Sequence, residues 1–595
     1  MRYDFTTIID RSTCGSNKWA GMRKIDPDVG PDVLPMSTAD MEFLTAPEIR
    51  EGLKTYIDTV IQGYTGPTQA YFDAVLGWQE RRHGYGGKQE WIVTTSGVVP
   101  AILMLVNVLT EPGDGVIVQQ PVYYPFSLAA RLTGRKLVNN ALIRKEDTYE
   151  IDFDDLEAKA RDPRNKVLIF CNPHNPVGKV WSREDLVRLA EICAANGVFI
   201  IDDEIHNDLI MPGYRHTALP TVSPKASRIC AYCTAPSKTF NLAGMQLSNI
   251  FIEDPTVRGK LALAKLMGMS LSQVAISYEA CRLAYDKGEP WLEELVRVVD
   301  GNAKYVEAFL AEHFPQVRCY PLEGTYLLWV DFRGLGLHHK DLERLMLSAK
   351  LFLDEGPMFG RDGRGFERFN LALPRSAVES AMARLLKTWQ ALQADWAANG
   401  RPERLTLEAG MEMPDFTYDT PFASGLHFAS ECGGKPTVLL FHRYYSCSIC
   451  GAALGRLAAE YDAVTAVGGQ VKVVLQSTPE SVRQAMGGEN KYPFEIICDP
   501  ERKLYERFSV FPADTMFDLA GDDFQSILPV AVSMFSGPQK DATPPEGMQD
   551  QLPAWFAVDG AGVIRHAHYG ETLFDVPDAA AMAEALRFGA PARNA

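Results

Sequence analysis

One lysine of this chain could form a covalent bond with a carbonyl compound. Lys238 lies in residues 234–244, directly after Ser237 and just beyond a short apolar run that ends near Tyr232. A lysine amine can condense with an aldehyde cofactor, and a neighbouring serine hydroxyl can bind a phosphate group of that cofactor. Because a lysine in a loop is more often simply solvated, this interpretation depends on which other polar residues reach the same place.

Short apolar runs alternate with helical patterns over the first 390 residues. Residues 115–119, 166–171 and 198–202 are examples, and they are rich in valine, isoleucine, leucine and phenylalanine. Such runs, separated by helices, predict an α/β fold with a mainly parallel sheet covered on both faces. Ligands of these folds bind at the carboxyl ends of the strands, so the residues that follow each run are the candidates for chemistry.

An amide, a carboxylate and the lysine follow three of these runs. Asn175 lies in a turn-rich loop after the run 166–171, Asp203 in an acidic cluster after the run 198–202, and Lys238 after the run that ends near Tyr232. The trio suits pyridoxal 5′-phosphate (PLP), whose ring is an electron sink only while a carboxylate keeps its nitrogen protonated. The amide can donate to the phenolic oxygen, and the lysine can carry the aldehyde carbon. Each residue alone is usually structural, but the ordered set predicts a cofactor site.

A series of short motifs accompanies this trio in one order along the chain. The motifs are Arg11-Ser-Thr13, Lys18-Trp19, Ala39-Asp-Met-Glu-Phe43, Gly63-Tyr-Thr65, Gly97-Val-Val-Pro100, Pro121-Val-Tyr-Tyr-Pro-Phe126, Asn172-Pro-His-Asn-Pro-Val-Gly178, Asp203-Glu-Ile-His206, Pro236-Ser-Lys-Thr-Phe-Asn241, Gly324-Thr-Tyr326 and Glu367-Arg-Phe-Asn370. With them, residues 1–390 resemble the fold-type I PLP enzymes, in particular the cystathionine β-lyase and C–S lyase branch typified by the MalY and PatB proteins. The resemblance implies a large PLP-binding domain with a mainly parallel sheet and a small α/β domain.

The resemblance implies a role for each matching residue around the cofactor ring. Lys238 forms the Schiff base and moves the Cα proton, while Asp203 pairs with the pyridine nitrogen. Asn175 contacts the ring oxygen. Tyr123 stacks on the ring, as a flat aromatic side chain beside a π-system is expected to do.

The phosphate is expected to bind at the start of a helix. The backbone amides of Val98 and Val99, which follow a glycine, are the implied donors, and Ser237 adds its hydroxyl group. The resemblance also implies that Tyr64 reaches the phosphate of the neighbouring subunit. This predicts a homodimer with Tyr64 in the catalytic site of its partner.

The substrate is expected to bind through its α-carboxylate. Arg368 is the implied bidentate partner, a task that lysine would perform poorly, and Tyr124 is a second substrate residue. Aminotransferases of this fold carry a serine and an arginine on the phosphate at positions where this chain has Ala235 and Gln246. That departure favours the lyase branch.

The implied activity is a C–S β-lyase that eliminates a thiol from an L-cysteine derivative. A cysteine conjugate, cystathionine or cystine would give pyruvate and ammonia, and the sequence does not determine which thiol leaves. Two alternatives stay open. One is an aminotransferase of a sulfur or aromatic amino acid, and the other is a regulatory binding protein built on the PLP fold.

A second cysteine-based site follows a new strand pattern. The apolar run 435–441 leads to Cys447 and Cys450, and a helix rich in small residues follows. A C-x-x-C pair at a helix start favours a thiolate at the first cysteine, and the second can resolve a mixed disulfide. With strand patterns at 471–475 and 494–498 and a hairpin pattern at 553–565, this part resembles the thioredoxin-like AhpC/TSA family. Thiol–disulfide exchange is favoured over peroxide reduction, because the usual peroxidase motif is missing, and two inert buried thiols are the alternative.

These patterns predict the organisation of the chain. The PLP part covers residues 1–393, with its large domain at 50–290 and its small domain at 1–49 and 291–393; a linker follows at 394–410 and the redox domain at 411–595. Residues 515–551 resemble an insertion without an assigned function, and the sequence does not show whether the two parts touch. Leu552-Pro553 stands where a thioredoxin-like fold usually has its cis-proline.

Charge and cysteine content narrow the possible partners and compartments. The formal net charge is −17 without a long basic run, which argues against nucleic acid and anionic membranes as partners. No apolar leader and no apolar span of about 18 residues is present, so we expect a cytoplasmic protein without a membrane segment. The eleven cysteines are odd in number and scattered, which excludes a disulfide framework. Neither C-x-x-C pair, Cys230/Cys233 or Cys447/Cys450, has a second such pair beside it at zinc-ribbon spacing, so structural zinc is not expected.

Overall fold

The apolar runs of the N-terminal part assemble into one large sheet. The computed structural model describes residues 2–30, 33–269, 273–515, 518–521 and 547–588. The strand order is β1-β9-β8-β7-β6-β2-β3, and β3, β2, β6, β7 and β8 run parallel while β9 is antiparallel to both of its neighbours. The strands are β1 (Ile92–Thr95), β2 (Gly115–Val118), β3 (Lys136–Asn139), β6 (Asn165–Cys171), β7 (Phe199–Asp203), β8 (Cys230–Thr234) and β9 (Ser248–Ile252). The predicted mainly parallel sheet is confirmed.

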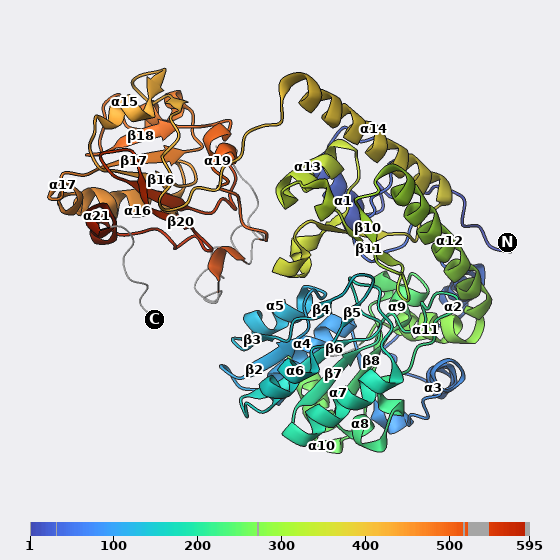
Figure 1. Cartoon of the computed structure of the whole chain (residues 1–595). Helices are drawn as coiled ribbons and strands as arrows, with labels where there is room; N and C mark the ends of the chain where they lie inside the picture. Colours follow the sequence, from blue (N-terminus) through green and yellow to red (C-terminus); the bar gives the residue numbers. More distant parts are fainter. Residues whose placement is uncertain (1, 31–32, 270–272, 516–517, 522–546, 589–595) are drawn as a thin grey trace. The chain divides into compact units, whose positions relative to one another are not determined.

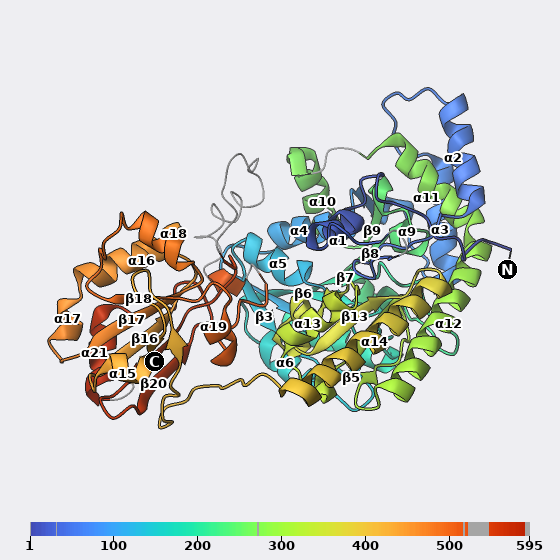
Figure 2. The ribbon, with the colours of Figure 1, turned by 90° about the horizontal axis from the view of Figure 1, so that it is seen from above.

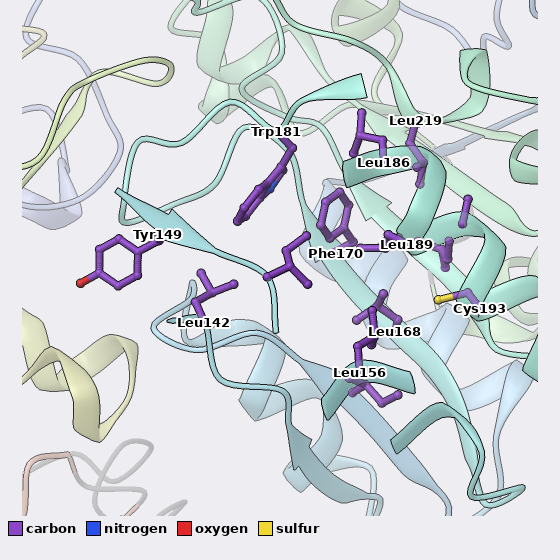
Figure 3. Close-up of a cluster of buried hydrophobic side chains, with 14 of the residues drawn as sticks. Leu142, Tyr149, Leu156, Leu168, Phe170, Trp181, Leu186, Leu189, Cys193 and Leu219 are labelled. Carbon is purple, nitrogen blue, oxygen red and sulfur yellow. The ribbon is translucent and has the colours of Figure 1, made fainter. Parts of the chain in front are cut away.

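Helices cover both faces of this sheet because its strands are apolar on both sides (Figure 1). One face packs on α4 (Val98–Leu109), α5 (Pro125–Leu132) and α10 (Pro255–Ala264), and the other on α6 (Phe153–Ala160), α7 (Arg183–Asn196) and α8 (Pro224–Arg228). Figure 3 shows the second core, where Leu168 and Phe170 of β6 meet Leu186 and Leu189 of α7. Each fully buried leucine or phenylalanine contributes about 1.5–3 kcal/mol.

Helix α7 illustrates how local sequence sets the ends of an element. Ser182 and Asp185 form a capping box at its start, with the Asp185 amide donating to the Ser182 hydroxyl over 3.0 Å. Gly197 ends the helix with a φ of 71°, a left-handed conformation that glycine adopts at little cost. The helix therefore delivers the chain into β7, and Asp203 is the last residue of that strand.

A smaller sheet completes the first of the two units into which the chain divides, residues 1–393 and 394–595. Its antiparallel order is β10-β11-β13-β12, with β10 (Arg318–Cys319), β11 (Leu327–Asp331), β12 (Asp354–Glu355) and β13 (Phe366–Asn370). The other elements of this unit are α1 (Asn17–Ile25), α2 (Pro47–Thr59), α3 (Gln69–His83), β4 (Ile143–Arg144), β5 (Tyr149–Glu150), α9 (Pro236–Thr239), α11 (Ala275–Lys287), α12 (Glu289–His313), α13 (His339–Ser348) and α14 (Arg375–Asn399).

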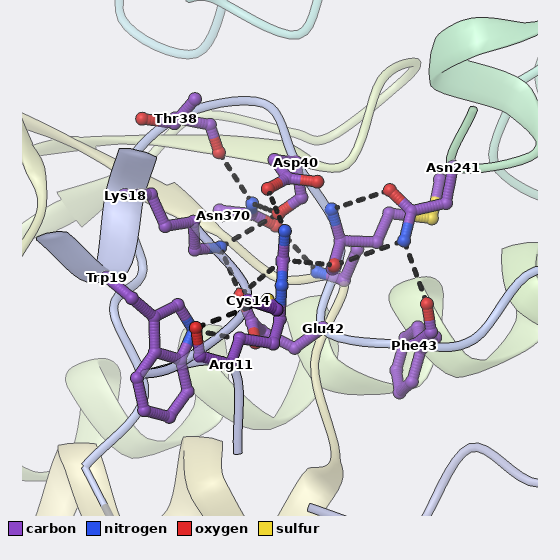
Figure 4. A network of polar contacts seen from close by, with 12 residues as sticks. Arg11, Cys14, Lys18, Trp19, Thr38, Asp40, Glu42, Phe43, Asn241 and Asn370 are labelled. Atoms are coloured by element: carbon purple, nitrogen blue, oxygen red, sulfur yellow. Dashed lines mark hydrogen bonds and ion pairs between the residues drawn. The ribbon is translucent and has the colours of Figure 1, made fainter. Parts of the chain in front are cut away.

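The N-terminal segment 36–43 connects the small sheet with the large one. Figure 4 shows its polar network, in which Asp40 and Glu42 bind the cations of Arg11 and Lys18. The Lys18–Glu42 pair, 3.0 Å apart, is almost completely buried, and the Trp19 indole also donates to Glu42 over 3.1 Å. Breaking a buried pair of this kind costs about 3–5 kcal/mol, so the segment is firmly held.

The second unit is a five-stranded sheet with helices on both sides. Its strand order is β18-β17-β16-β19-β20; β16, β17 and β18 are parallel, and β19 and β20 form the predicted hairpin. Its elements are β14 (Thr417–Tyr418), β15 (Leu426–His427), α15 (Phe428–Cys432), β16 (Thr437–Phe441), α16 (Ser448–Ala459), α17 (Asp462–Thr465), β17 (Gln470–Leu475), α18 (Pro479–Ala485), β18 (Glu495–Cys498), α19 (Lys503–Arg507), β19 (Ala554–Val558), β20 (Ile564–Tyr569) and α21 (Ala579–Phe588). Most of the predicted insertion 515–551 lies outside the described residues.

The described residues contain neither a helix that could span a membrane nor a group of side chains that could bind a metal ion. None of their helices combines the length and the apolar composition that a membrane crossing requires. Their histidine, cysteine, aspartate and glutamate side chains form no group of three that could bind a metal ion.

Candidate active site

A cavity of about 330 Å³ lies where the strands β6, β7 and β8 end. It is lined by every residue that the sequence assigned to cofactor or substrate in this unit, with the exception of Tyr64. These residues are Val98, Val99, Tyr123, Tyr124, Asn175, Asp203, Ser237, Lys238 and Arg368. The parallel sheet brings Asn175, Asp203 and Lys238 to this edge, and β13 of the small sheet adds Arg368, so that residues up to 270 positions apart line one cavity.

Lys238 is held by a backbone carbonyl from the N-terminal segment. Its Nζ donates to the Ala39 oxygen over 2.6 Å, and the hydroxyl of the neighbouring Thr239 donates to Asp208 over 2.8 Å. Burial lowers the pKa of the Lys238 ammonium to about 8. A lysine with a pKa this close to neutrality can act as a nucleophile and as a base, which fits the predicted chemistry.

Asp203 is a buried carboxylate whose main hydrogen bond comes from the backbone. It accepts from the Ile205 amide over 3.1 Å. Burial raises the pKa of the Asp203 carboxyl to about 7. A cation in the cavity beside it would lower that pKa and stabilise the ionised form, so the position suits a protonated ring nitrogen.

Arg368 is oriented by two side chains before any substrate binds. Its Nη1 donates to the Asn175 Oδ1 over 2.7 Å, and its Nη2 donates to the Asp354 Oδ2 over 2.5 Å. The guanidinium group also lies 4.8 Å from the centre of the Phe359 ring. Because Arg368 occupies the amide oxygen, the Asn175 side chain offers its NH₂ group as donor, which fits the predicted contact with a ring oxygen.

The predicted phosphate end of the cavity is the start of α4. Val98 and Val99 are the first residues of this helix, whose N-terminal amides have no partner within the helix and attract anions. Ser96, Ser237 and Gln246 line the same cavity. Two hydroxyl groups and one side-chain amide are therefore available beside the start of α4 as further hydrogen-bond donors to a phosphate.

The three predicted tyrosines differ in position. Tyr123 and Tyr124 line the cavity with ring centres 5.4 Å apart, and burial raises the pKa of both hydroxyls. Tyr64 follows α2 and is fully exposed, so it is not part of the cavity of its own chain. Its role in a neighbouring subunit stays a prediction.

Sequence reasoning gave no role to three other residues of the cavity wall, His206, Thr38 and Asp354. His206 is almost completely buried, and its ring meets Tyr326 edge-on at 5.8 Å. Its place three residues after Asp203, at a strand end, is a signal that could have found it. Thr38 lies in a loop and Asp354 in the two-residue strand β12, and neither place has a diagnostic sequence pattern.

The second unit places its cysteine pair as predicted, at the junction of β16 and α16. The Cys447 Sγ accepts from the Arg443 Nη2 over 2.9 Å and from the Cys450 amide over 3.3 Å. The Cys450 thiol, the Arg443 charge and the backbone amides together lower the pKa of Cys447 to about 6, whereas the bond to Cys447 raises the pKa of Cys450. The pair is a thiolate beside a buried, protonated thiol. The Leu552–Pro553 bond is not among the cis peptide bonds of the described residues, so that prediction was wrong.

These features define the class of protein. A buried lysine, a strand-end carboxylate and a helix start around one cavity characterise a cofactor-dependent α/β enzyme. Residues 31–385, more than half of the chain, match the family model of aminotransferases of class I and II, and residues 409–567 match the AhpC/TSA family. The chain therefore belongs to the aminotransferase class I and II family and carries a thioredoxin-like AhpC/TSA domain.

Particular relatives specify the branch. Cystathionine β-lyase PatB of Bacillus subtilis is 42% identical over 356 residues, which cover 60% of this chain and 92% of PatB. Protein MalY of Escherichia coli is 29% identical over 66% of this chain and 100% of its own length. Cystalysin from Treponema denticola, whose crystal structure contains a PLP cofactor, is 43% identical with a TM-score of 0.65 and covers 66% of this chain and 100% of cystalysin. The resemblance to this branch is confirmed.

The residues of the cavity fit the cofactor seen in that relative. Asp203 is a buried carboxylate without an ion pair among the described side chains, and Lys238 has a lowered pKa. The start of α4 supplies unpaired amides to a phosphate, and Tyr123 supplies an aromatic wall. The cavity thus offers each part of PLP a group of the chemistry that would hold it.

Proposed function

We propose that the first unit is a PLP-dependent C–S β-lyase that releases a thiol from an L-cysteine derivative to give pyruvate and ammonia. The observation that carries the proposal is the placement of Lys238, Asp203 and a pre-oriented Arg368 around one cavity. The 42% identity with a cystathionine β-lyase over 92% of that enzyme supports it. A cysteine conjugate, cystathionine and cystine are the proposed substrates.

The residues of the cavity divide the work of the elimination. Bound PLP supplies the electron sink for the charge that develops when the Cα proton leaves. Arg368 binds the substrate carboxylate, and the amine of Lys238 takes the Cα proton; the electron pair of the C–H bond then expels the β-sulfur as a thiolate. Asp203 holds a proton on the ring nitrogen, which requires the carboxylate to stay ionised. The released enamine hydrolyses in water to pyruvate and ammonia.

An assay of pyruvate over a substrate panel tests the proposal. Cystathionine, cystine and S-alkylcysteines are added to the PLP-loaded protein, and pyruvate is measured in each case. At least one of these compounds is expected to give pyruvate in proportion to the released thiol. Absence of pyruvate from every compound, with the cofactor absorbance intact, would overturn the assignment.

We further propose that the first unit acts as a homodimer with Tyr64 in the site of the partner. The support is two sets of exposed apolar side chains, one at the end of α2 and in the residues that follow it, the other at the end of α10, just after it and directly before α11. Figure 2 shows α2 and α11 side by side. The exposed residues are Ile57, Val60, Ile61, Tyr64, Leu263, Leu266, Met267 and Val274. Several large apolar side chains exposed on neighbouring elements favour an interface between proteins.

A mixed dimer tests the Tyr64 assignment. Loss of a hydrogen bond to a charged phosphate costs about 1.5–3 kcal/mol, so Tyr64→Ala is expected to bind PLP about 10- to 100-fold more weakly. Co-expression of Tyr64→Ala with Lys238→Ala is expected to restore about a quarter of the wild-type activity, because half of the dimers then contain one intact site. No restoration in dimers shown to be mixed would place Tyr64 in its own chain's site.

The second unit is proposed to reduce disulfides of the substrate or the sulfur product. The thiolate of Cys447 attacks one sulfur of a disulfide and releases the other as a thiolate. Cys450 then attacks Cys447, which frees the reduced product and leaves a Cys447–Cys450 disulfide for an external dithiol to reduce. None of the eleven cysteines, all of which lie within the described residues, forms a disulfide bond, and this supports a reducing compartment and the proposed cytoplasmic location.

Single cysteine variants separate the two steps of this reaction. Cys447→Ser is expected to lose disulfide reduction, whereas Cys450→Ser is expected to accumulate a mixed disulfide visible by mass spectrometry. The rate should fall below pH 6, because protonation removes the Cys447 thiolate. Cys432→Ser serves as the control in the same unit. Equal rates for Cys447→Ser and the control would show that the pair is inert.

A further inference from the structure

Two glutamates face each other directly behind Arg368. Glu355 of β12 and Glu367 of β13 are partners in the antiparallel ladder, as are their neighbours Asp354 and Arg368. Glu367 is 0% exposed, and its carboxylate oxygens accept no hydrogen bond from an N–H group, a hydroxyl group or a cation of the described residues. The Glu355 carboxyl lies within hydrogen-bonding reach of it. Two ionised carboxylates could not occupy these positions without strong repulsion.

The cations near this pair are already engaged. Helix α13 presents Lys340 and Glu343 to it, and their charged groups lie 3.2 Å apart. Arg368 is bonded to Asp354 in the same way. Burial, followed by the neighbouring carboxylates, raises the pKa of Glu367, and burial raises the pKa of Glu355 to about 7. A shared proton is therefore the means by which the pair avoids an uncompensated buried charge.

The pair is one residue away from the group that orients Arg368. The Asp354 Oδ2 accepts both from the Arg368 Nη2, over 2.5 Å, and from the Thr38 amide, over 2.6 Å. Strand β12 is an edge strand of only two residues, and its ladder partner is β13 alone. Successive residues of a strand point to opposite faces, so Arg368 reaches the cavity while Glu367 points away from it. A shift of Glu355 would move Asp354 with it.

We propose that Glu355 and Glu367 share one proton and act as positioning residues for Arg368, so that loss of this proton separates β12 from β13 and weakens binding of the substrate carboxylate. The inference rests on the proposed function, because Arg368 is the residue assigned there to the carboxylate. The shared proton adds a requirement for substrate binding that the residues around the cofactor do not impose. Substrate affinity depends on a protonation step outside the cavity.

The ratio of KM at pH 10 to KM at pH 7.5 tests this inference, because Glu355 ionises near pH 7 and the shared proton on Glu367 is lost only well above that. Glu367→Gln keeps the shape of the side chain and always donates to Glu355, so it reproduces the protonated pair at every pH. The wild-type ratio is expected to exceed the Glu367→Gln ratio by about tenfold, the factor that corresponds to one pKa unit. The pH profile of kcat should be common to both, because titration of Lys238 and of the substrate amine is unchanged. Glu312→Gln, on the exposed surface of α12, is the control and should keep the wild-type ratio.

Thermal unfolding supplies a readout that does not depend on activity. Because folding raises the pKa of Glu355 from 4.5 to about 7, the folded chain keeps a proton that the unfolded chain releases. Wild-type stability should therefore fall relative to Glu367→Gln from about pH 4.5 upward, and the fall should continue above pH 7, because Glu367 keeps its proton after Glu355 has ionised. Parallel stability curves, or equal KM ratios, would overturn the inference. If pyruvate forms but wild type and Glu367→Gln have equal KM ratios, the inference about the glutamate pair fails and the proposed function stands. If no substrate gives pyruvate, the proposed function fails, and the unfolding curves alone decide whether the two glutamates share a proton.

Discussion

Lys238→Ala is expected to lower the rate of thiol elimination by about 10²- to 10⁴-fold, the contribution of a well-placed acid–base group. The reason lies in the geometry of the site: the amine is buried, its pKa is lowered to about 8, and it is the lysine of the cavity wall. Pyruvate release is measured with saturating substrate and added PLP. The absorbance of the bound cofactor should change as well, because its covalent link to the protein is lost.

The matched control for this variant is Lys260→Ala, on the exposed side of α10. It should keep the wild-type rate. A thermal unfolding curve of Lys238→Ala checks that removal of a buried cation has left the fold intact. Wild-type rates in a folded Lys238→Ala protein would show that another group moves the proton.

Arg368→Lys is expected to lower kcat/KM by about 30- to 5,000-fold. Truncating one partner of a buried, hydrogen-bonded charge pair costs about 2–5 kcal/mol. A lysine ammonium cannot bond to Asn175, Asp354 and a substrate carboxylate in one plane, whereas the guanidinium fork already bonds to the first two. The loss should appear mainly in KM, because Arg368 grips a part of the substrate that does not react.

Arg297→Lys, an exposed arginine of α12, is the control for this change. A substrate analogue without the carboxylate should bind equally weakly to wild type and to Arg368→Lys. If the variant lowered kcat and left KM unchanged, Arg368 would act on the reacting atoms and not on the carboxylate.

The strand-end residues were predictable because a parallel sheet has a regular consequence. Apolar runs identified β6, β7 and β8, and the residues after them had to meet at one edge. This reasoning placed Asn175, Asp203 and Lys238 correctly in one cavity. The cysteine pair was predictable for a similar reason. The strand pattern at 435–441 is followed by a helical pattern, so Cys447 and Cys450 had to lie at the first turn of that helix.

The contacts between distant loops were not predictable from periodicity. The bond from Lys238 to the Ala39 oxygen joins residues 199 positions apart, and both lie outside regular strands. Strand β12 has two residues, too few for an alternating pattern, so nothing in the sequence placed Glu355 opposite Glu367. Such contacts depend on how the small sheet packs, a tertiary property that local patterns do not contain.

The central claim is that this cavity eliminates a thiol and does not transfer an amino group. A mass balance on cystathionine tests it most directly, with pyruvate, ammonia and thiol measured in one reaction without an amino acceptor. Equal amounts of the three products are expected, with no dependence on an added 2-oxo acid. Product formation that requires such an acceptor and yields a 2-oxo acid with the whole substrate skeleton, without ammonia, would contradict it.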